Sequence, residues 1–323
     1  MEKKKVLIAM PLHKDRKERF IEEFPECEFE FIYRKDLKPE DLRGKEVIMG
    51  FPKPEWLGEA DKMKWLQIYM AGNDAYTKAY AEDPAPFEGW TLTNASGCYS
   101  LAISEYMVGM SLAYRLNLFA YDRDMRKKQW TDNGSVYSAE GAVVLSVGTG
   151  SIGGAYCKRM KALGSYVIGV RRSHHKEVPD FCDEMHTVDE LDELLPRADI
   201  VALSMPATGE SSGMLNMRRF KLMKDSAIVI NVGRGGAIVQ SDLVEALNND
   251  IIGGACLDVF EKEPIPEDDP IWDAKNAVLT PHVSGGWHLY QTIEYISDLS
   301  MRNLRHYLNG EPLENVVDLK KGY

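Results

Sequence analysis

The sequence predicts an α/β protein with two domains, each built on a parallel sheet. Short apolar runs of strand length alternate with segments of helical spacing along the whole chain, and several of these runs end in glycine-rich or polar turns. At 323 residues the chain exceeds the length at which one hydrophobic core usually suffices. Because alternating strands and helices form βαβ units, we expect two Rossmann- or flavodoxin-like domains.

The first hundred residues read as one alternating unit. Its candidate strands are residues 6–10, 29–33, 47–50, 65–69 and 91–93. Residues 101–121 follow with the pattern of a single long, mostly apolar helix, with Ser100 as its N-cap. We expect this helix to join the two domains.

The second half repeats the alternation. Its candidate strands are residues 143–147, 166–170, 200–203, 227–232, 254–257 and 278–279, and its candidate helices are residues 152–163, 191–195, 216–223 and 241–248. A last helical stretch, 290–308, has no strand partner of its own, so we expect it to return to the first domain. The predicted first domain is therefore discontinuous, with residues 1–99 and 288–323, and the second spans 100–287.

Composition excludes several functional classes. A formal net charge of −11 without a basic stripe argues against nucleic-acid binding, and no apolar run reaches the length of a membrane span. The five cysteines are scattered without the paired spacing of a zinc site, so no metal is expected. Polar and charged residues at 13–16 cut short the apolar run that begins at Val6, so we expect a buried strand rather than a secretory leader. We therefore expect a cytoplasmic location.

A glycine-rich turn marks a candidate dinucleotide site. The strand at 143–147 runs into a Gly-x-Gly-x-x-Gly pattern that opens the next helix, where backbone amides and the helix N-terminus can face a pyrophosphate. A tight turn with close helix packing is the alternative interpretation. The residues of this turn are Gly148, Thr149, Gly150, Ser151, Ile152 and Gly153.

The end of the following strand predicts the cofactor. NAD-binding sites usually carry an acidic residue there for the ribose hydroxyls, whereas this chain has Arg171, Arg172 and Ser173. Guanidinium groups suit a 2′-phosphate, so NADPH is favoured and NAD stays possible. The alternative is a pair of surface arginines that form ion pairs with nearby acids.

Three polar side chains follow later apolar runs: Arg234, Glu263 and His282. In a doubly wound sheet the carboxyl ends of the strands bind ligands. A guanidinium can hold a carboxylate, an imidazole can move a proton, and a glutamate can orient that imidazole. Singly each residue has an ordinary surface interpretation, but together, downstream of a dinucleotide turn, they indicate a catalytic set.

With these motifs the chain resembles the D-isomer-specific 2-hydroxyacid dehydrogenase family over nearly its whole length. The resemblance rests on the glycine turn and on three later stretches, 223–235, 257–264 and 280–285. It implies that Arg234 binds the substrate carboxylate and that His282 is the acid/base, with Glu263 as its partner. It also implies that Met70, Ala71 and Gly72 receive the substrate carboxylate, and that the cofactor cleft is lined by Met205, Pro206, Thr208, Val232, Gly233 and Asp258.

The expected function is hydride transfer between NADPH and a small 2-oxo acid, giving a D-2-hydroxy acid. The arginine pair resembles that of the NADPH-linked glyoxylate and hydroxypyruvate reductases of this family. A regulator or corepressor-like scaffold that senses the dinucleotide is the alternative, and formate oxidation is disfavoured because formate-oxidising relatives have glutamine in place of Glu263. The long helix at 101–121 looks like the family's dimerisation element, so a homodimer is expected.

Overall fold

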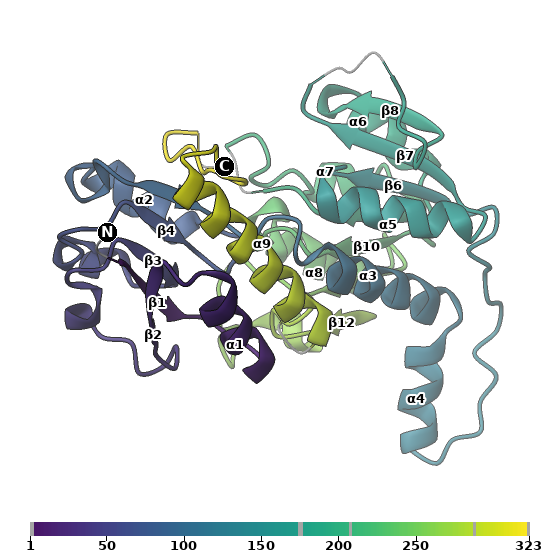
Figure 1. Ribbon diagram of the computed structural model, residues 1–323. Helices are drawn as coiled ribbons and strands as arrows, with labels where there is room; N and C mark the ends of the chain where they lie inside the picture. The colour runs from purple at the N-terminus through teal and green to yellow at the C-terminus, as the bar shows by residue number, and fades with distance from the viewer. Residues whose placement is uncertain (1–2, 174–176, 207–208, 287–288, 322–323) are drawn as a thin grey trace. The chain divides into compact units, whose positions relative to one another are not determined.

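The computed structural model describes residues 3–173, 177–206, 209–286 and 289–321, which fold into two compact units (Figure 1). Unit 1 contains residues 1–99 and 287–323, and unit 2 contains residues 100–286. Each unit is built on a parallel sheet, and both ends of the chain contribute to unit 1. The predicted fold class, two parallel-sheet α/β domains with the first discontinuous, is confirmed.

The described part of unit 1 has a five-stranded sheet with the order β2-β1-β3-β4-β5, and all neighbours are parallel. The order reverses between β1 and β3, which makes the carboxyl ends of these strands a topological switch point. The strands are β1 (Lys4–Ala9), β2 (Cys27–Phe31), β3 (Val47–Gly50), β4 (Trp65–Gln67) and β5 (Thr91–Thr93).

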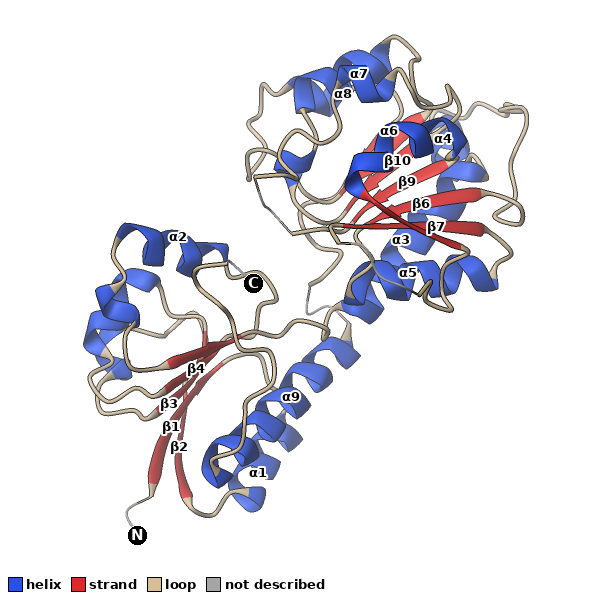
Figure 2. Cartoon of the chain, turned by 90° about the horizontal axis from the view of Figure 1, so that it is seen from above, coloured by secondary structure: helices blue, strands red, loops and turns tan. Residues whose placement is uncertain are grey.

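Helices cover both faces of this sheet (Figure 2). On one face lies α2 (Asp74–Glu82), where Tyr76 packs among Leu7, Ile48 and Leu66 of the strands. On the other face lie α1 (Lys14–Glu23) and α9 (Tyr290–Asn309). Because successive strand residues point to opposite faces, each sheet residue serves one of these two layers.

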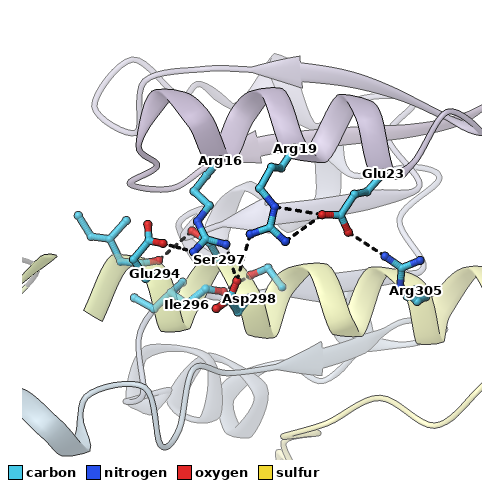
Figure 3. Close-up of polar contacts among 10 residues, drawn as sticks. Arg16, Arg19, Glu23, Glu294, Ile296, Ser297, Asp298 and Arg305 are labelled. Atoms are coloured by element: carbon cyan, nitrogen blue, oxygen red, sulfur yellow. Dashed lines mark hydrogen bonds and ion pairs between the residues drawn. The ribbon is translucent and has the colours of Figure 1, made fainter. Parts of the chain in front are cut away.

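Ion pairs fasten α9 to α1 (Figure 3). Arg16 is 8% exposed and pairs with Glu294 and Asp298 of α9. Glu23 accepts hydrogen bonds from Arg19 and, at 2.9 Å, from Arg305. A buried arginine is stable only with its partners in place, so these contacts specify where α9 packs in unit 1.

The described part of unit 2 has a seven-stranded parallel sheet with the order β12-β11-β10-β9-β6-β7-β8. The order reverses between β6 and β9. The short polar edge strand β8 was not expected from the sequence, because it lacks an apolar run. The strands are β6 (Val143–Val147), β7 (Tyr166–Arg171), β8 (Glu184–Thr187), β9 (Ile200–Leu203), β10 (Ile228–Asn231), β11 (Gly254–Leu257) and β12 (Ala277–Leu279).

The helices of unit 2 are α3 (Ser100–Arg115), α4 (Leu118–Arg126), α5 (Ser151–Ala162), α6 (Leu191–Leu194), α7 (Met217–Phe220) and α8 (Gln240–Asn248). The prediction of one helix over 101–121 was wrong, because the chain breaks between α3 and α4. Asn117 adopts a left-handed backbone with φ of 56°, and its Nδ2 donates to the carbonyls of Asn133 and Ser135, both at 3.2 Å. Asparagine tolerates this conformation better than other side chains do, so the break occurs there.

Candidate functional site

The glycine turn of unit 2 joins β6 to α5 and is tightly packed. Gly148 has φ of +95°, and its N–H donates to the carbonyl of Val170 at 2.9 Å. A Cβ on Gly153 would lie 1.9 Å from the carbonyl oxygen of Gly148, so no side chain fits there. The turn therefore depends on glycine at both positions, for conformation at the first and for close packing at the second.

The middle glycine differs, because a Cβ on Gly150 would meet nothing within 4 Å. Around it, backbone segments pack without side chains between them: added Cβ atoms on Gly148 and Gly233 would lie 2.9 and 2.7 Å from backbone atoms of Met205. Such a cradle of bare backbone, open at Gly150 and followed by a helix N-terminus, fits the pyrophosphate of a dinucleotide. Of the expected cofactor residues, Thr208 lies outside the described part of the chain.

Arg171 is the last residue of β7. The next two residues, Arg172 and Ser173, are exposed. The Arg171 Nε lies 3.2 Å from the sulfur of Met185, a weak acceptor. Within residues 3–173, 177–206, 209–286 and 289–321, Arg171 forms no ion pair with a carboxylate. The surface ion-pair interpretation of Arg171 therefore finds no partner among these residues.

His282 and Glu263 are hydrogen-bonded to each other. The His282 Nδ1 lies 2.7 Å from the Glu263 Oε2, while the other carboxylate oxygen accepts the N–H of Phe260 at 3.0 Å. Because a carboxylate only accepts, the proton between them resides on Nδ1, and Nε2 is left to exchange a proton with a ligand. No group of the described chain hydrogen-bonds to that Nε2.

Arg234 follows β10 in a turn held by Asn231. The Asn231 side chain accepts the N–H of Gly233 at 3.1 Å and donates to the carbonyl of Arg234 at 3.0 Å. A Cβ on Gly235 would lie 1.9 Å from the carbonyl carbon of Phe260, so the arginine turn packs on the segment that orients Glu263. Through that contact the turns after β10 and β11 meet at the edge where His282 follows β12.

Asp258 comes directly after β11 and is 1% exposed. Its carboxylate accepts four hydrogen bonds, from the hydroxyl of Thr280 at 2.6 Å, the N–H of Val283 at 2.9 Å, and the N–H and hydroxyl of Ser284 at 2.9 and 2.5 Å. All four donors flank His282. The carboxylate thus fixes the segment that carries the imidazole.

The expected carboxylate-binding loop lies in unit 1, after β4. The carbonyl of Met70 accepts the N–H of Ala95 at 2.9 Å, and that of Ala71 accepts the side-chain Nδ2 of Asn94 at 3.0 Å. Within the described chain, the N–H groups of Met70, Ala71 and Gly72 donate to no protein acceptor. A loop whose carbonyls are tied down and whose amides are unused is suited to bind an anion.

Comparison with known proteins identifies the family. The model for "D-isomer specific 2-hydroxyacid dehydrogenase, NAD binding domain" matches residues 108–284, which is more than half of the chain. The chain belongs to this family. The matched stretch includes the glycine turn, Arg171, Arg234, Asp258, and the hydrogen-bonded pair after β11 and β12, so unit 2 corresponds to the family's NAD-binding domain.

Curated relatives and solved structures agree with this assignment. A glyoxylate reductase of Thermofilum pendens is 31% identical over 263 residues, covering 80% of this chain and 75% of that protein. A family member from Aeromonas salmonicida has a TM-score of 0.85 at 29% identity, covering 99% of this chain and 100% of that one. An NADPH-dependent glyoxylate/hydroxypyruvate reductase from Sinorhizobium meliloti, solved with NADP and sulfate, has a TM-score of 0.83 at 26% identity, covering 99% and 100%.

Several residues that hold the candidate sites of the two units were not predicted from the sequence. Asn94 acts through its side-chain amide on the carbonyl of Ala71, 23 positions away in the chain, and nothing in its local sequence indicates it. Phe260, Asn231 and Ser284 had a signal, since each lies within a motif stretch that predicted Glu263, Arg234 or His282. Each of them forms a hydrogen bond that holds the turn or the side chain next to it.

Metal-binding clusters and membrane-spanning helices are absent from the part of the chain that the structure describes. No group of three or more histidine, cysteine or acidic side chains there could hold a metal ion. None of its helices has the length and apolar character needed to cross a bilayer. All five cysteines are buried and unbridged.

Two glycine substitutions separate folding from cofactor binding. Gly153→Ala introduces the clash with Gly148, so we expect a loss of stability of about 1–3 kcal/mol together with weaker dinucleotide binding. Gly150→Ala adds its methyl to open space and should leave the melting temperature close to that of wild type, while dinucleotide affinity falls at least about tenfold. Thermal unfolding and cofactor titration measure both effects. If Gly150→Ala bound the dinucleotide as tightly as wild type does, the assignment of the pyrophosphate to this turn would be rejected.

Proposed function

We propose that the protein is an NADPH-dependent reductase of short 2-oxo acids, with a glyoxylate- or hydroxypyruvate-type substrate, that forms D-2-hydroxy acids. The observation that carries this proposal is the pair formed by His282 and Glu263, with Nδ1 and Oε2 2.7 Å apart and Nε2 left for a ligand. The glyoxylate reductase of Thermofilum pendens and the Sinorhizobium meliloti glyoxylate/hydroxypyruvate reductase support the substrate class.

The chemistry assigns a separate task to each side chain. Bound NADPH would supply the hydride. Arg234 would bind the substrate carboxylate and polarise the ketone through its N–H donors. As the ketone oxygen gains negative charge, protonated His282 would donate the Nε2 proton to it, while Glu263 holds the imidazole by Nδ1–H and stabilises its positive charge. For unit 1 we propose separately that the amides of the loop at Met70, Ala71 and Gly72 bind a carboxylate.

Replacing His282 tests the assignment. We expect His282→Ala to lower kcat for glyoxylate or hydroxypyruvate by about 10²–10⁴-fold, the usual contribution of general acid–base catalysis, with little change in NADPH affinity. The assay follows oxidation of NADPH with a panel of 2-oxo acids that also includes pyruvate, 2-ketoisocaproate and phenylpyruvate. His306→Ala is the control, because that histidine also lies near a glutamate, with its Nε2 3.8 Å from Glu311, and has no proposed role.

One result would contradict this function, and a second would contradict the role of His282. If wild-type protein binds dinucleotide but reduces no member of the panel, a dinucleotide-sensing scaffold becomes the better hypothesis. If His282→Ala keeps full turnover on a substrate that the wild type reduces, the reductase function is retained, but the proton donor is another group.

The preference for NADPH over NADH rests on the end of β7. Arg171 stands where NAD-binding sites usually carry an acid, and Met185 is its neighbour in the described chain. Arg172 and Ser173 follow as further donors. A guanidinium next to the adenosine ribose favours a 2′-phosphate over a bare hydroxyl, and the Sinorhizobium meliloti reductase was solved with NADP.

We expect Arg171→Asp to reverse the preference. Loss of charge-assisted hydrogen bonds to the 2′-phosphate should weaken NADPH binding about 10- to 100-fold, while the new carboxylate can accept hydrogen bonds from the ribose of NADH. Lys158→Asp, on the exposed side of α5, makes the same change in charge and should alter neither affinity. If Arg171→Asp binds each of the two cofactors as tightly as wild type does, the assignment is rejected.

We also propose that the protein is a homodimer through α3, α4 and the segment after them. α4 and residues 127–137 extend away from the sheet of unit 2 (Figure 1). Trp130 is 93% exposed in this segment, and Leu118, Met125 and Tyr137 are exposed as well. Apolar side chains concentrated in this way usually mark an interface.

Light scattering at micromolar concentration should therefore give about twice the chain mass of 36.5 kDa. Trp130→Glu is expected to shift the mass toward one chain, because it introduces a charge into the interface. Trp272→Glu, at another exposed tryptophan of unit 2, is the control and should leave the mass unchanged. A wild-type mass of a single chain would contradict the homodimer.

A further inference from the structure

A chain of hydrogen bonds connects α3 to the segment of His282. The hydroxyl of Tyr106 on α3 lies 2.7 Å from the hydroxyl of Thr280, which in turn lies 2.6 Å from a carboxylate oxygen of Asp258. Tyr106 and Thr280 are 174 positions apart in the sequence. Asp258 also accepts the donors of Val283 and Ser284.

The direction of these bonds is fixed by Asp258. Its two oxygens receive the N–H groups of Val283 and Ser284, as an ionised carboxylate does, so Thr280 must donate its hydroxyl proton to it. The oxygen of Thr280 then accepts, and Tyr106 is the donor. Burial raises the pKa of Tyr106, and the nearby Asp258 raises it further, so the phenol keeps the proton that it donates.

The backbone between Thr280 and Val283 is strained, so the hydrogen bonds to Asp258 are needed to hold it. His282 has φ of 52°, a left-handed backbone that is costly for a residue with a side chain, and its N–H donates to the carbonyl of Thr280 at 3.0 Å. Thr280 on one side and Val283 with Ser284 on the other are bound to the same carboxylate. A shift of Thr280 or Asp258 would therefore move the imidazole relative to Glu263.

The helix α3 is a firm support for the first donor. Ser111 of α3 bonds to Tyr156 of α5 with their hydroxyl oxygens 2.8 Å apart, and Tyr114 donates to the carbonyl of Gly253 next to β11. Tyr106 thus extends from a helix that is fastened at other points, so removing its hydroxyl leaves the helix in place.

We propose that Tyr106 is a positioning residue for proton transfer, which acts through Thr280 and Asp258 to hold His282 where its Nε2 meets the substrate. This inference rests on the proposed reductase function, since it assigns a role within that reaction. It links the catalytic segment of unit 2 to α3, the same helix that we assign to the subunit interface.

Tyr106→Phe tests the proposal against a matched control on the same helix. Positioning errors lower turnover more than binding, so we expect kcat for the best 2-oxo acid to fall about tenfold, with KM for NADPH and the melting temperature nearly unchanged. Tyr114→Phe removes the same hydroxyl near the C-terminal end of α3, where it donates to Gly253, and should keep wild-type kcat.

A double-mutant cycle identifies the route. Thr280→Ser keeps the hydroxyl and should retain kcat, whereas Thr280→Val should lose at least as much as Tyr106→Phe. Because both residues act through one carboxylate, the double variant Tyr106→Phe/Thr280→Val should be no slower than Thr280→Val alone. Additive losses, or a wild-type kcat in Tyr106→Phe, would overturn the proposal.

Hydrogen exchange keeps this inference separable from the proposed function. If no 2-oxo acid is reduced by wild-type protein, the reductase function fails, and the positioning claim is judged by amide exchange in residues 278–286. We expect faster exchange at Val283 and Ser284 in Tyr106→Phe than in Tyr114→Phe. Equal protection in the two variants would show that Tyr106 does not hold the segment.

Discussion

The arrangement of the candidate active site depends on one buried carboxylate, that of Asp258. It lies at the carboxyl end of β11, 1% exposed, and its neighbours on both sides of His282 donate to it. A buried charge of this kind is stable only when its hydrogen bonds are made. The segment that carries the imidazole is consequently folded around the carboxylate, and the orientation of His282 follows from electrostatics rather than from apolar packing.

The parallel sheet of unit 2 explains why the remaining groups gather near this carboxylate. In a parallel sheet every carboxyl end lies on the same edge, so the turns after β6, β9, β10, β11 and β12 meet there. Close packing of bare backbone at Gly148, Met205 and Gly233 holds these turns together, while the space beside Gly150 stays open. Sequence positions more than a hundred residues apart thereby contribute to one site.

Much of this could be predicted from the sequence, because apolar periodicity and glycine turns are local signals. The glycine turn and the hydrogen-bonded partners His282 and Glu263 stood in recognisable motifs. Contacts set by tertiary structure could not be predicted. The break at Asn117 depends on carbonyls in the loop after α4, and Tyr106 meets Thr280 only once α3 has packed in unit 2.

The left-handed backbone of His282 connects stability with chemistry. Such a conformation costs about 1–3 kcal/mol in a residue with a side chain, while a hydrogen bond to a charged group contributes about 1.5–3 kcal/mol. Donors from Val283, Ser284 and Thr280 therefore offset the strain, and the Nδ1 of His282 lies 2.7 Å from Glu263 in the same conformation. The same carboxylate that makes the strained turn stable thereby places His282 within hydrogen-bond distance of Glu263, and this bond uses Nδ1 and leaves Nε2 for a ligand.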